Sequence, residues 1–539
     1  MQKERKKQRG QENRQRAEQE KKERIHQRMQ EGSKEGADRK DGKQEFHPVV
    51  KEIDENIRQY EQLFAQCSDI KMRKMLLGKE MNVRCMVAYI ETSVGNMILE
   101  QSTLGKTLNR LCQIPSETVL SCVAQNSLGI SDAAPMETIE DAAAGMLAGD
   151  AILFVDGYDK ALKIPDKGYP NMGVTKTDSE KVIRGSNEGF AESVKVNTAL
   201  IRKRIRSPRV KVVEKKIGIR SQTNVDLVYV EGLADPGLLK SIEARLDAFE
   251  IDGILDSGSI EQLTEEDWLS PFPQFQTTLR PDRAAMSILE GRIVLLVDNS
   301  PSALILPTDY NSFIQTSDDY YNRWEIASFT RLLRYAAAFL AMVLPGFYLA
   351  VTNFHTQILP TSLLLSFAAS RQGVPFPGLV EILLMELSFE LLREAGIRLP
   401  GAMGNTIGIV GGLIIGQAAV DANIVSAMVV IVVAMTALCS FAIPNEEFAT
   451  AFRLLKFAFI FLCAFLGFYG FLLGLLFVLI HLSHLESFGI PYMTPFVDAA
   501  RDMQGERDSL IRPPAWALNR RPIYANPKER IRLRRRRRT

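Results

Sequence analysis

Three long stretches without charge dominate the last third of this 539-residue chain. No Asp, Glu, Lys or Arg occurs from Tyr335 to Ser370 or from Phe457 to Leu485, and the stretch from Leu399 to Asn445 contains only Asp421. A helix needs about 20 mainly apolar residues to cross a bilayer, and each stretch reaches or exceeds that length. A soluble domain does not need three such runs. The sequence therefore predicts a polytopic membrane domain built of α-helices.

The apolar pattern also indicates where the crossings lie. We predict spans near 335–352, 357–370, 405–420, 423–442 and 457–482. The second of these is short for a full crossing. The segment 379–394 is ambiguous, so we expect five or six transmembrane helices.

Basic residues beside the first span predict its orientation. Arg323, Arg331 and Arg334 precede this span, and the loop after it contains no Lys or Arg. Cytoplasmic flanks carry the excess of basic residues, so the N-terminal region should be cytoplasmic. The Arg-rich C-terminus should prefer the same side, which requires an even number of crossings.

Charge is distributed unevenly, and the net charge of +2 hides this. Residues 1–45 contain 15 Lys/Arg and 10 Asp/Glu, which predicts a disordered charged tail, either simply solvated or attracted to anionic lipid. Residues 501–539 contain 13 Lys/Arg and 4 Asp/Glu. The charged start predicts no amino-terminal signal peptide. We therefore expect a cytosolic soluble part, in which the six cysteines are reduced packing residues.

Between the tail and the membrane domain, helical and strand-like patterns alternate. Helical stretches include 49–66 and 189–205, and short apolar runs predict strands at 151–155, 226–230 and 292–297. Proline and glycine cluster near 165–185, which indicates a junction between two α/β subdomains. We therefore divide the chain into five parts. They are a charged tail (1–45), two cytosolic α/β subdomains (46–170 and 171–330), a helical membrane domain (331–485) and a basic C-terminal tail (486–539).

No catalytic signature occurs in the sequence: it has no Walker loop, no GxSxG and no HExxH. His481 and His484 are three residues apart and can share a helix face, but they have no cysteine partner, which favours an interfacial role over a metal site. We expect no enzymatic activity, no catalytic residue, no cofactor, no metal and no nucleic-acid partner.

The segment 375–400 predicts a helix with an acidic stripe. Pro375 and Pro377 fit a helix start, and Gly396 and Pro400 fit its end. Within about 100° of one another on this helix lie Glu386, Glu390, Arg393 and Glu394. Glu381 lies apart, near the start, and leucine, methionine and phenylalanine cover the rest.

Three interpretations of this stripe stay open. The helix can lie in the membrane interface as an amphipathic segment. Its carboxylates can instead face water inside an assembly, since intramembrane carboxylates usually face a cavity and rings of them attract cations. The stripe can also be a salt-bridged packing face. The second interpretation makes Glu386, Glu390 and Glu381 candidates for an ion path.

A glycine ladder follows this helix. Gly404, Gly408, Gly412 and Gly416 are each four residues apart, and Gly470 and Gly474 repeat the spacing in the last span. Glycines on one helix face let a second helix approach closely. The ladder predicts tight helix packing, within the chain or between chains, and says nothing about chemistry.

Several longer motifs resemble the A subunits of GerA-family spore germination receptors. In the membrane part they are Leu-Leu-Leu-Ser-Phe-Ala-Ala-Ser-Arg-Gln-Gly-Val-Pro-Phe-Pro at 363–377, Leu-Arg-Glu-Ala-Gly-Ile-Arg-Leu-Pro at 392–400 and Ile-Val-Gly-Gly-Leu-Ile-Ile-Gly-Gln-Ala-Ala-Val at 409–420. In the soluble part they are the segments 184–193, 197–202 and 289–301. The resemblance covers roughly residues 150–485. The chain departs from the expected pattern at Ser362, Gln372 and Asn423, which puts pore details in doubt.

The resemblance implies a membrane subunit of a nutrient germinant receptor in the spore inner membrane. It implies two partners, a transporter-like B subunit, to which nutrient binding is usually assigned, and a lipoprotein C subunit. It also implies a homo-oligomer that releases cations through a channel. The alternative is a non-conducting structural or signalling subunit that relays a signal from the B subunit. A membrane enzyme is the weakest interpretation, because no acid/base pair lies at the membrane face.

Overall fold

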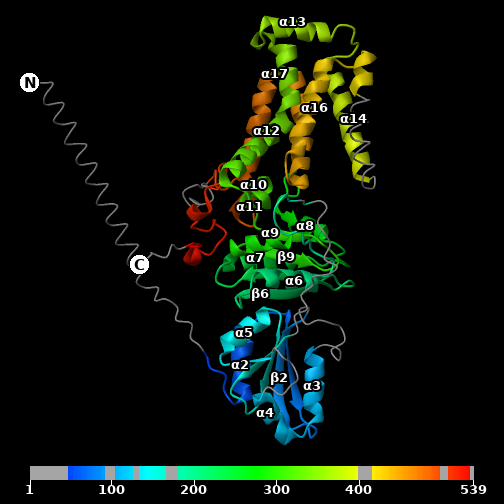
Figure 1. Ribbon diagram of the computed structural model, residues 1–539. Coiled ribbons are helices and arrows are strands. Elements are labelled where there is room, and N and C mark those ends of the chain that lie inside the picture. The colour runs from blue at the N-terminus through cyan, green and yellow to red at the C-terminus, as the bar shows by residue number, and fades with distance from the viewer. Residues whose placement is uncertain are drawn as a thin grey trace, which may run out of the picture.

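The computed structural model describes residues 47–91, 103–125, 133–165, 180, 182–398, 416–497 and 508–533. Figure 1 shows a column: one sheet domain at the bottom, a second sheet domain above it and a helical domain at the top. The C-terminal segment, in red, lies beside the second sheet domain and below the long helices. The prediction of an α/β soluble region followed by a helical domain is confirmed.

The first sheet domain, here called the first repeat, is a five-stranded antiparallel sheet with the strand order β1-β2-β4-β5-β3. Both of its faces are covered, and β4 is buried along its whole length, because an apolar cluster lies on each side of the sheet. Its elements are α2 (Ile53–Leu63), β1 (Ile70–Leu77), β2 (Val83–Ile90), α3 (Thr103–Gln113), α4 (Ser116–Ala124), β3 (Ala134–Met136), α5 (Ile139–Leu147), β4 (Ala151–Val155) and β5 (Ala161–Ile164).

The second sheet domain, the second repeat, has the same element order and the equivalent strand order, β6-β7-β9-β10-β8. Its central strand β9 is also fully buried, between two further apolar clusters. Its elements are α6 (Val194–Arg204), β6 (Val210–Ile217), β7 (Thr223–Val230), α7 (Pro236–Leu246), α8 (Ser257–Thr264), β8 (Gln276–Thr278), α9 (Pro281–Leu289), β9 (Ile293–Val297) and β10 (Ala303–Leu306).

Equivalent hydrogen bonds occur within each of the two repeats, in addition to the common topology. The Asn56 side chain bonds both backbone groups of Val50, and the Asn197 side chain bonds both backbone groups of Ala191. A carboxylate after the fourth strand caps the first helix of each repeat: Asp156 accepts from the Ile53 amide, and Asp298 accepts from the Val194 amide. One architecture is therefore present twice. The predicted strands at 151–155, 226–230 and 292–297 lie at its centre.

The repeats contact each other through backbone and charge. Cys67 forms a parallel bridge with Val212, and Ser68 donates its amide to the Val212 carbonyl at 3.0 Å. Arg202 of the second repeat donates two hydrogen bonds to Asp69 of the first, at 2.8 and 3.0 Å. Arg202 is fully buried, so this paired charge fixes the relative position of the two sheets.

The helical domain begins with two short helices, α10 (Tyr310–Ile314) and α11 (Ser317–Tyr321). The longer elements are α12 (Trp324–Phe354), η1 (Thr356–Ile358), α13 (Thr361–Ser370), α14 (Gly378–Arg398), α16 (Ala427–Phe441) and α17 (Glu446–His484). By length and composition, α12 and α17 can cross a membrane. The predicted span 357–370 forms only η1 and the ten-residue α13, which lies across the far end of the domain in Figure 1.

Helix α17 folds back on itself, so the predicted span 457–482 contains parts of two antiparallel arms. The turn is at Gly467, where φ is 59° and ψ is −138°, values that glycine adopts without strain. Both arms return to the second repeat: Glu447 accepts from the Thr277 hydroxyl, and His481 Nε2 bonds the Ser270 hydroxyl at 2.8 Å. A straight helix of this length would hold those two residues about 50 Å apart.

The arms of α17 pack against α12. At Gly346 of α12, an added Cβ would lie 2.9 Å from the Phe459 carbonyl oxygen, so only glycine permits this approach. The segment after α17 then turns back along the second repeat, through the two-stranded β11 (Glu486–Ser487) and β12 (Ile490–Pro491) and the short turns η2 (Ala515–Ala517) and η3 (Pro527–Glu529). The number of crossings stays a prediction, because the predicted span 405–420 lies mostly outside the described residues.

A buried carboxylate, Asp226 on β7, stands where the first repeat has Met86 on β2. It is 4% exposed, and its Oδ1 atom has no hydrogen-bond partner within the described part of the chain. Burial, followed by the charges of Glu214, Asp69 and Asp298, raises the pKa of Asp226 from 3.8 to about 7, against the opposing effect of Lys195.

We predict that Asp226 lowers the stability of the folded chain as the pH rises. The folded pKa lies above the unfolded value, so the native state binds the proton more tightly, and stability falls between about pH 4 and pH 7. Replacement by Asn should therefore raise the apparent melting temperature of the full-length protein more at pH 8 than at pH 5. Thermal unfolding in detergent measures this, with the exposed Asp252→Asn as control. The prediction would be contradicted if the apparent melting temperatures of the wild type and Asp226→Asn changed with pH in the same way.

Candidate functional site

The acidic stripe of α14 faces basic side chains of α17. Lys456 Nζ donates to Glu386 Oε2 at 2.6 Å and to Glu390 Oε1 at 3.4 Å. The side chains of Lys456 and Glu386 are 5% and 3% exposed, so this is a buried ion pair between two apolar helices. Such a pair is stable only when both charges are present, because removing one leaves the other desolvated and unpaired.

More basic residues surround this pair. Arg453 lies 3.7 Å from Glu390 Oε2, and both Arg393 and Arg453 form ion pairs with Glu446. Glu386 Oε1 and Arg453 Nε have no hydrogen-bond partner in the described residues. Both residues line a cavity of about 30 Å³, which has room for about two waters. The cluster is therefore polar, hydratable and close to charge balance.

Glu381 belongs to a different place. It is fully buried at the start of α14, accepts from the Ser426 amide at 2.8 Å and lies 3.3 Å from Arg371. The structure thus brings Glu386 and Glu390 together and keeps Glu381 apart, as the helical wheel indicates. In this single chain the stripe faces cations. Whether it faces water in an assembly stays a prediction.

The basic partners were missed by sequence reasoning. Lys456 lies 70 residues from Glu386, and no local pattern joins them. A signal was present, because Arg453 and Lys456 are three apart at the start of an uncharged run, and such cations near a span need a partner. Which acidic helix supplies that partner depends on how the helices pack.

The predicted packing glycines fall into two groups. Gly470 and Gly474 lie between the arms of α17, where an added Cβ would meet Leu462 or Phe459. An added Cβ at Gly416 would lie 3.4 Å from Val430 of α16. The remaining members of the ladder, Gly404, Gly408 and Gly412, lie outside the described residues.

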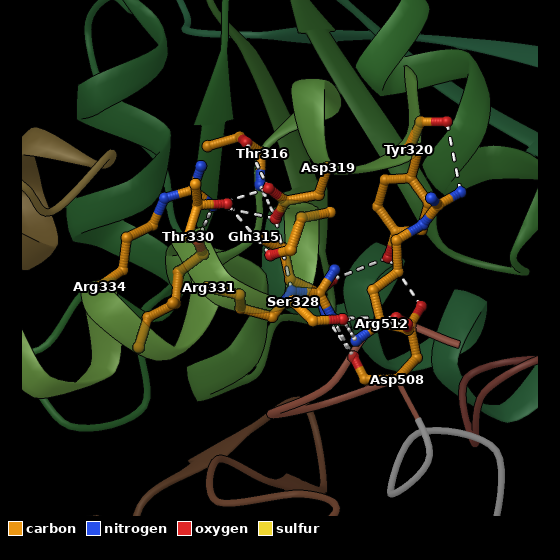
Figure 2. A network of polar contacts seen from close by, with 12 residues as sticks. Gln315, Thr316, Asp319, Tyr320, Ser328, Thr330, Arg331, Arg334, Asp508 and Arg512 are labelled. Carbon is orange, nitrogen blue, oxygen red and sulfur yellow. Dashed lines mark hydrogen bonds and ion pairs between the residues drawn. The ribbon is translucent and has the colours of Figure 1, made fainter. Parts of the chain in front are cut away.

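A second polar cluster joins the base of α12 to the α10–α11 region and to the C-terminal segment (Figure 2). Arg331 of α12 is fully buried and donates from Nη1 to Asp508 Oδ1 at 2.9 Å and to the Asp508 carbonyl at 2.7 Å. Its Nε donates to Asp319 Oδ2 at 3.4 Å, and Arg334 Nη1 lies 2.9 Å from both oxygens of Asp319. We call this cluster the junction network.

Aromatic and amide groups extend the junction network. Tyr320 donates its hydroxyl to Asp508 Oδ2 at 2.8 Å, and Gln315 Nε2 donates to the Asp508 carbonyl at 2.7 Å. Arg512 donates to the Asn322 carbonyl at 3.0 Å. Burial raises the pKa of the Asp508 carboxyl, and the charge of Arg331 opposes that shift. The predicted basic tail thus contributes an acidic residue to the foot of the first membrane helix.

Comparisons with known proteins agree with these features. The family model described as "Bacillus/Clostridium GerA spore germination protein" matches residues 58–524. Spore germination protein KA of Bacillus subtilis (strain 168) is 38% identical over 477 residues, covering 88% of this chain and 87% of that protein. Spore germination protein A1 of the same organism is 40% identical over 398 residues, covering 74% of this chain and 82% of that protein.

Two further matches concern the membrane and the soluble part. The uncharacterized membrane protein YfkQ of Bacillus subtilis (strain 168) is 40% identical over 476 residues, covering 88% of this chain and 91% of that protein. The crystal structure of the N-terminal domain of the A subunit of the Bacillus megaterium spore germinant receptor GerK3 is 28% identical, with a TM-score of 0.38, and covers 48% of this chain and 96% of that chain.

The buried ion pair predicts a specific pattern of stability changes. Lys456→Met should destabilise the helical domain by about 3–5 kcal/mol, because Glu386 stays buried without its cation. The double variant Lys456→Met/Glu386→Gln removes both charges and should recover most of the loss. Apparent melting temperatures in detergent test this, with the exposed Arg398→Met as control. A double variant as unstable as the single one would contradict the pairing.

Proposed function

This chain belongs to the Bacillus/Clostridium GerA spore germination protein family, as an A subunit of a germination receptor, and on that premise we propose how it acts. It assembles as a homo-oligomer in the spore inner membrane and conducts cations when the receptor is triggered by a nutrient. The acidic face of α14 lines the ion path, with Glu386 and Glu390 in its middle, and Glu381, which is buried apart from that face, lies outside the path. GerA is a receptor family, and we assign the chain no catalytic role.

One observation carries this proposal: the Glu386 carboxylate lies among apolar helices, with one oxygen that has no partner in the described residues, beside a small cavity lined by charged and apolar side chains. A carboxylate is costly in such a place and is retained where it meets ions or water. Repetition of the same helix around an axis would place these carboxylates in a ring, which attracts cations.

The basic partners supply a closed state. With Lys456 bonded to Glu386 and Arg453 beside Glu390, the acidic face is neutralised and offers little to a cation. Opening then requires these cations to move away from the carboxylates, as a shift of α17 relative to α14 would do. The ion pairs thus hold the closed state, and their separation exposes the negative charges of the two carboxylates.

Partners follow from the family. We propose that the chain works with a transporter-like B subunit, which binds the nutrient, and with a lipoprotein C subunit. The exposed apolar residues of α12 and α17, such as Phe329, Leu454 and Phe465, suit lipid or a neighbouring subunit.

The second candidate is a non-conducting subunit that relays the signal of the B subunit. The junction network favours it, because Arg331 ties the first membrane helix to α11 and to the C-terminal segment, and Arg283 of the second repeat donates to the Gln315 carbonyl of that network. A movement of the soluble repeats would be transmitted to α12 through these bonds. The relay and the ion path are compatible, and conductance separates a pure relay from a channel.

We predict that Glu386→Gln/Glu390→Gln, made in a Lys456→Met background so that no buried cation stays unpaired, abolishes cation flux and leaves assembly intact. The amides keep the size of the side chains and remove the charges that attract cations. Flux is measured in liposomes that contain the assembled receptor with its nutrient added, because the chain conducts only when triggered, and assembly is measured by size-exclusion chromatography. The matched control is Glu325→Gln, an exposed residue in the first turn of α12. Undiminished flux in the double variant would remove the path from α14, and silence of the assembled wild type would favour the relay.

A further inference from the structure

The segment between α8 and β8 runs along the foot of the helical domain. Ser270 bonds His481 near the end of α17, with 2.8 Å between Oγ and Nε2. Two residues further on, the buried Phe272 ring lies 5.9 Å from the Phe448 ring and 5.6 Å from the Phe452 ring, both near the start of α17. The segment is therefore fixed against both ends of α17.

Two large apolar side chains are exposed immediately before this anchor. Trp268 is 77% exposed and Leu269 is 73% exposed. Trp268 is also the only tryptophan in the sequence of the two repeats. Adjacent apolar side chains in such a position mark a surface that meets another molecule or a membrane.

The backbone of this loop already has its hydrogen-bond partners within the protein. The buried Gln274 side chain accepts from the Glu266 and Asp267 amides and donates to the Asp267 carbonyl. Asp267 in turn accepts from the Leu269 amide on its side chain and from the Ser270 amide on its carbonyl. Apolar surroundings offer no replacement partners, so only a loop of this kind can approach the acyl region of a bilayer.

The exposed pair continues the lipid-facing surface of α17. The exposed apolar residues of the second arm extend down to the residue before His481, and they are Leu472, Leu473, Leu476, Phe477, Leu479 and Ile480. His481 holds Ser270, which directly follows Leu269. The pair therefore lies at the level where the apolar surface of α17 ends. Tryptophan is enriched at this boundary between membrane and water, because its ring is apolar and its N–H is polar.

The charges beside the loop favour an apolar contact over an electrostatic one. Burial, with the charge of Glu447 in addition, raises the pKa of Glu261 from 4.5 to about 8, so this carboxyl is mostly protonated at pH 7. Glu266 forms an ion pair with Arg245. No excess of positive charge is present in this part of the described chain to attract anionic headgroups, so salt should not weaken the contact.

We propose that Trp268 and Leu269 dock the second repeat on the membrane leaflet that faces the two repeats, at the boundary between headgroups and acyl chains. The bond between Ser270 and His481 sets the depth of the loop. A repeat held by the leaflet as well as by the helices has fewer ways to tilt. The inference rests on the membrane insertion of α17 and not on the ion path, and its test measures lipid contact rather than flux.

The test uses the full-length protein in phosphatidylcholine vesicles, with or without bromine on the acyl chains near the headgroup. The chain has three tryptophans, so Trp324→Phe/Trp516→Phe leaves Trp268 as the only one. Its emission should fall about twofold in brominated vesicles, because bromine quenches an indole that contacts the lipid at this depth. Aqueous iodide should quench it little, and added salt should change neither result.

Two reporters, each placed in a chain without the native tryptophans, set the scale. Phe477→Trp, exposed on the second arm of α17, should be quenched by bromine, and Leu120→Trp, on α4 at the far end of the first repeat (Figure 1), should not. If Trp324→Phe/Trp516→Phe disturbs the fold, the quenching lost between the wild type and Trp268→Phe measures the same contact.

Three outcomes would overturn the proposal. Quenching of Trp268 by iodide and not by bromine would place the loop in water. Resistance to both quenchers would place it against a neighbouring copy of the chain. An unquenched Phe477→Trp would remove the membrane insertion of α17, on which the proposal rests, whereas flux experiments address the ion path separately.

Discussion

The buried Arg331 is the charge on which the arrangement of the whole chain depends. It lies fully buried at the foot of α12, and a cation in that position is tolerable only beside carboxylates. Asp319 comes from the helix just before α12, and Asp508 comes from a segment that follows all the membrane helices. The pairing therefore closes the chain into a loop, with the helical domain projecting from a base made by both ends. Any motion of α11 or of the C-terminal segment must act on these bonds.

Duplication explains how such a base is built. The two repeats share topology and capping, but some equivalent positions differ in charge. Asp226 replaces a core methionine where the repeats meet, and Arg292 replaces Asp150 where the second repeat meets the helical domain. The first repeat keeps an apolar core at the first of these positions. The second repeat has become the part that links the soluble region to the membrane.

In the helical domain, too, a buried charge needs an oppositely charged partner. Glu386 and Lys456 neutralise each other between apolar helices, and Glu386, whose Oε1 atom has no partner in the described part of the chain, lines a small cavity. An ion pair of this kind has no net charge while its members are in contact, and each member presents a full charge once they separate. A modest movement of α17 is therefore sufficient to change the electrostatics of the domain. Each arm of α17 contacts the second repeat at the end away from Gly467, so a movement of that repeat acts on both arms.

The sequence by itself determined the membrane insertion, the two α/β units and the acidic helix. These follow from local patterns, because a long uncharged run is stable in a membrane and a fully apolar strand such as 293–297 is stable in a protein core. Only the tertiary structure decided the partners: Lys456 for Glu386, Asp508 for Arg331, and the return of α17 at Gly467. It also showed that the two α/β units are one architecture repeated. The physical reason is that apolar burial is set by neighbours along the chain, whereas a buried charge is satisfied by whichever distant helix packs against it.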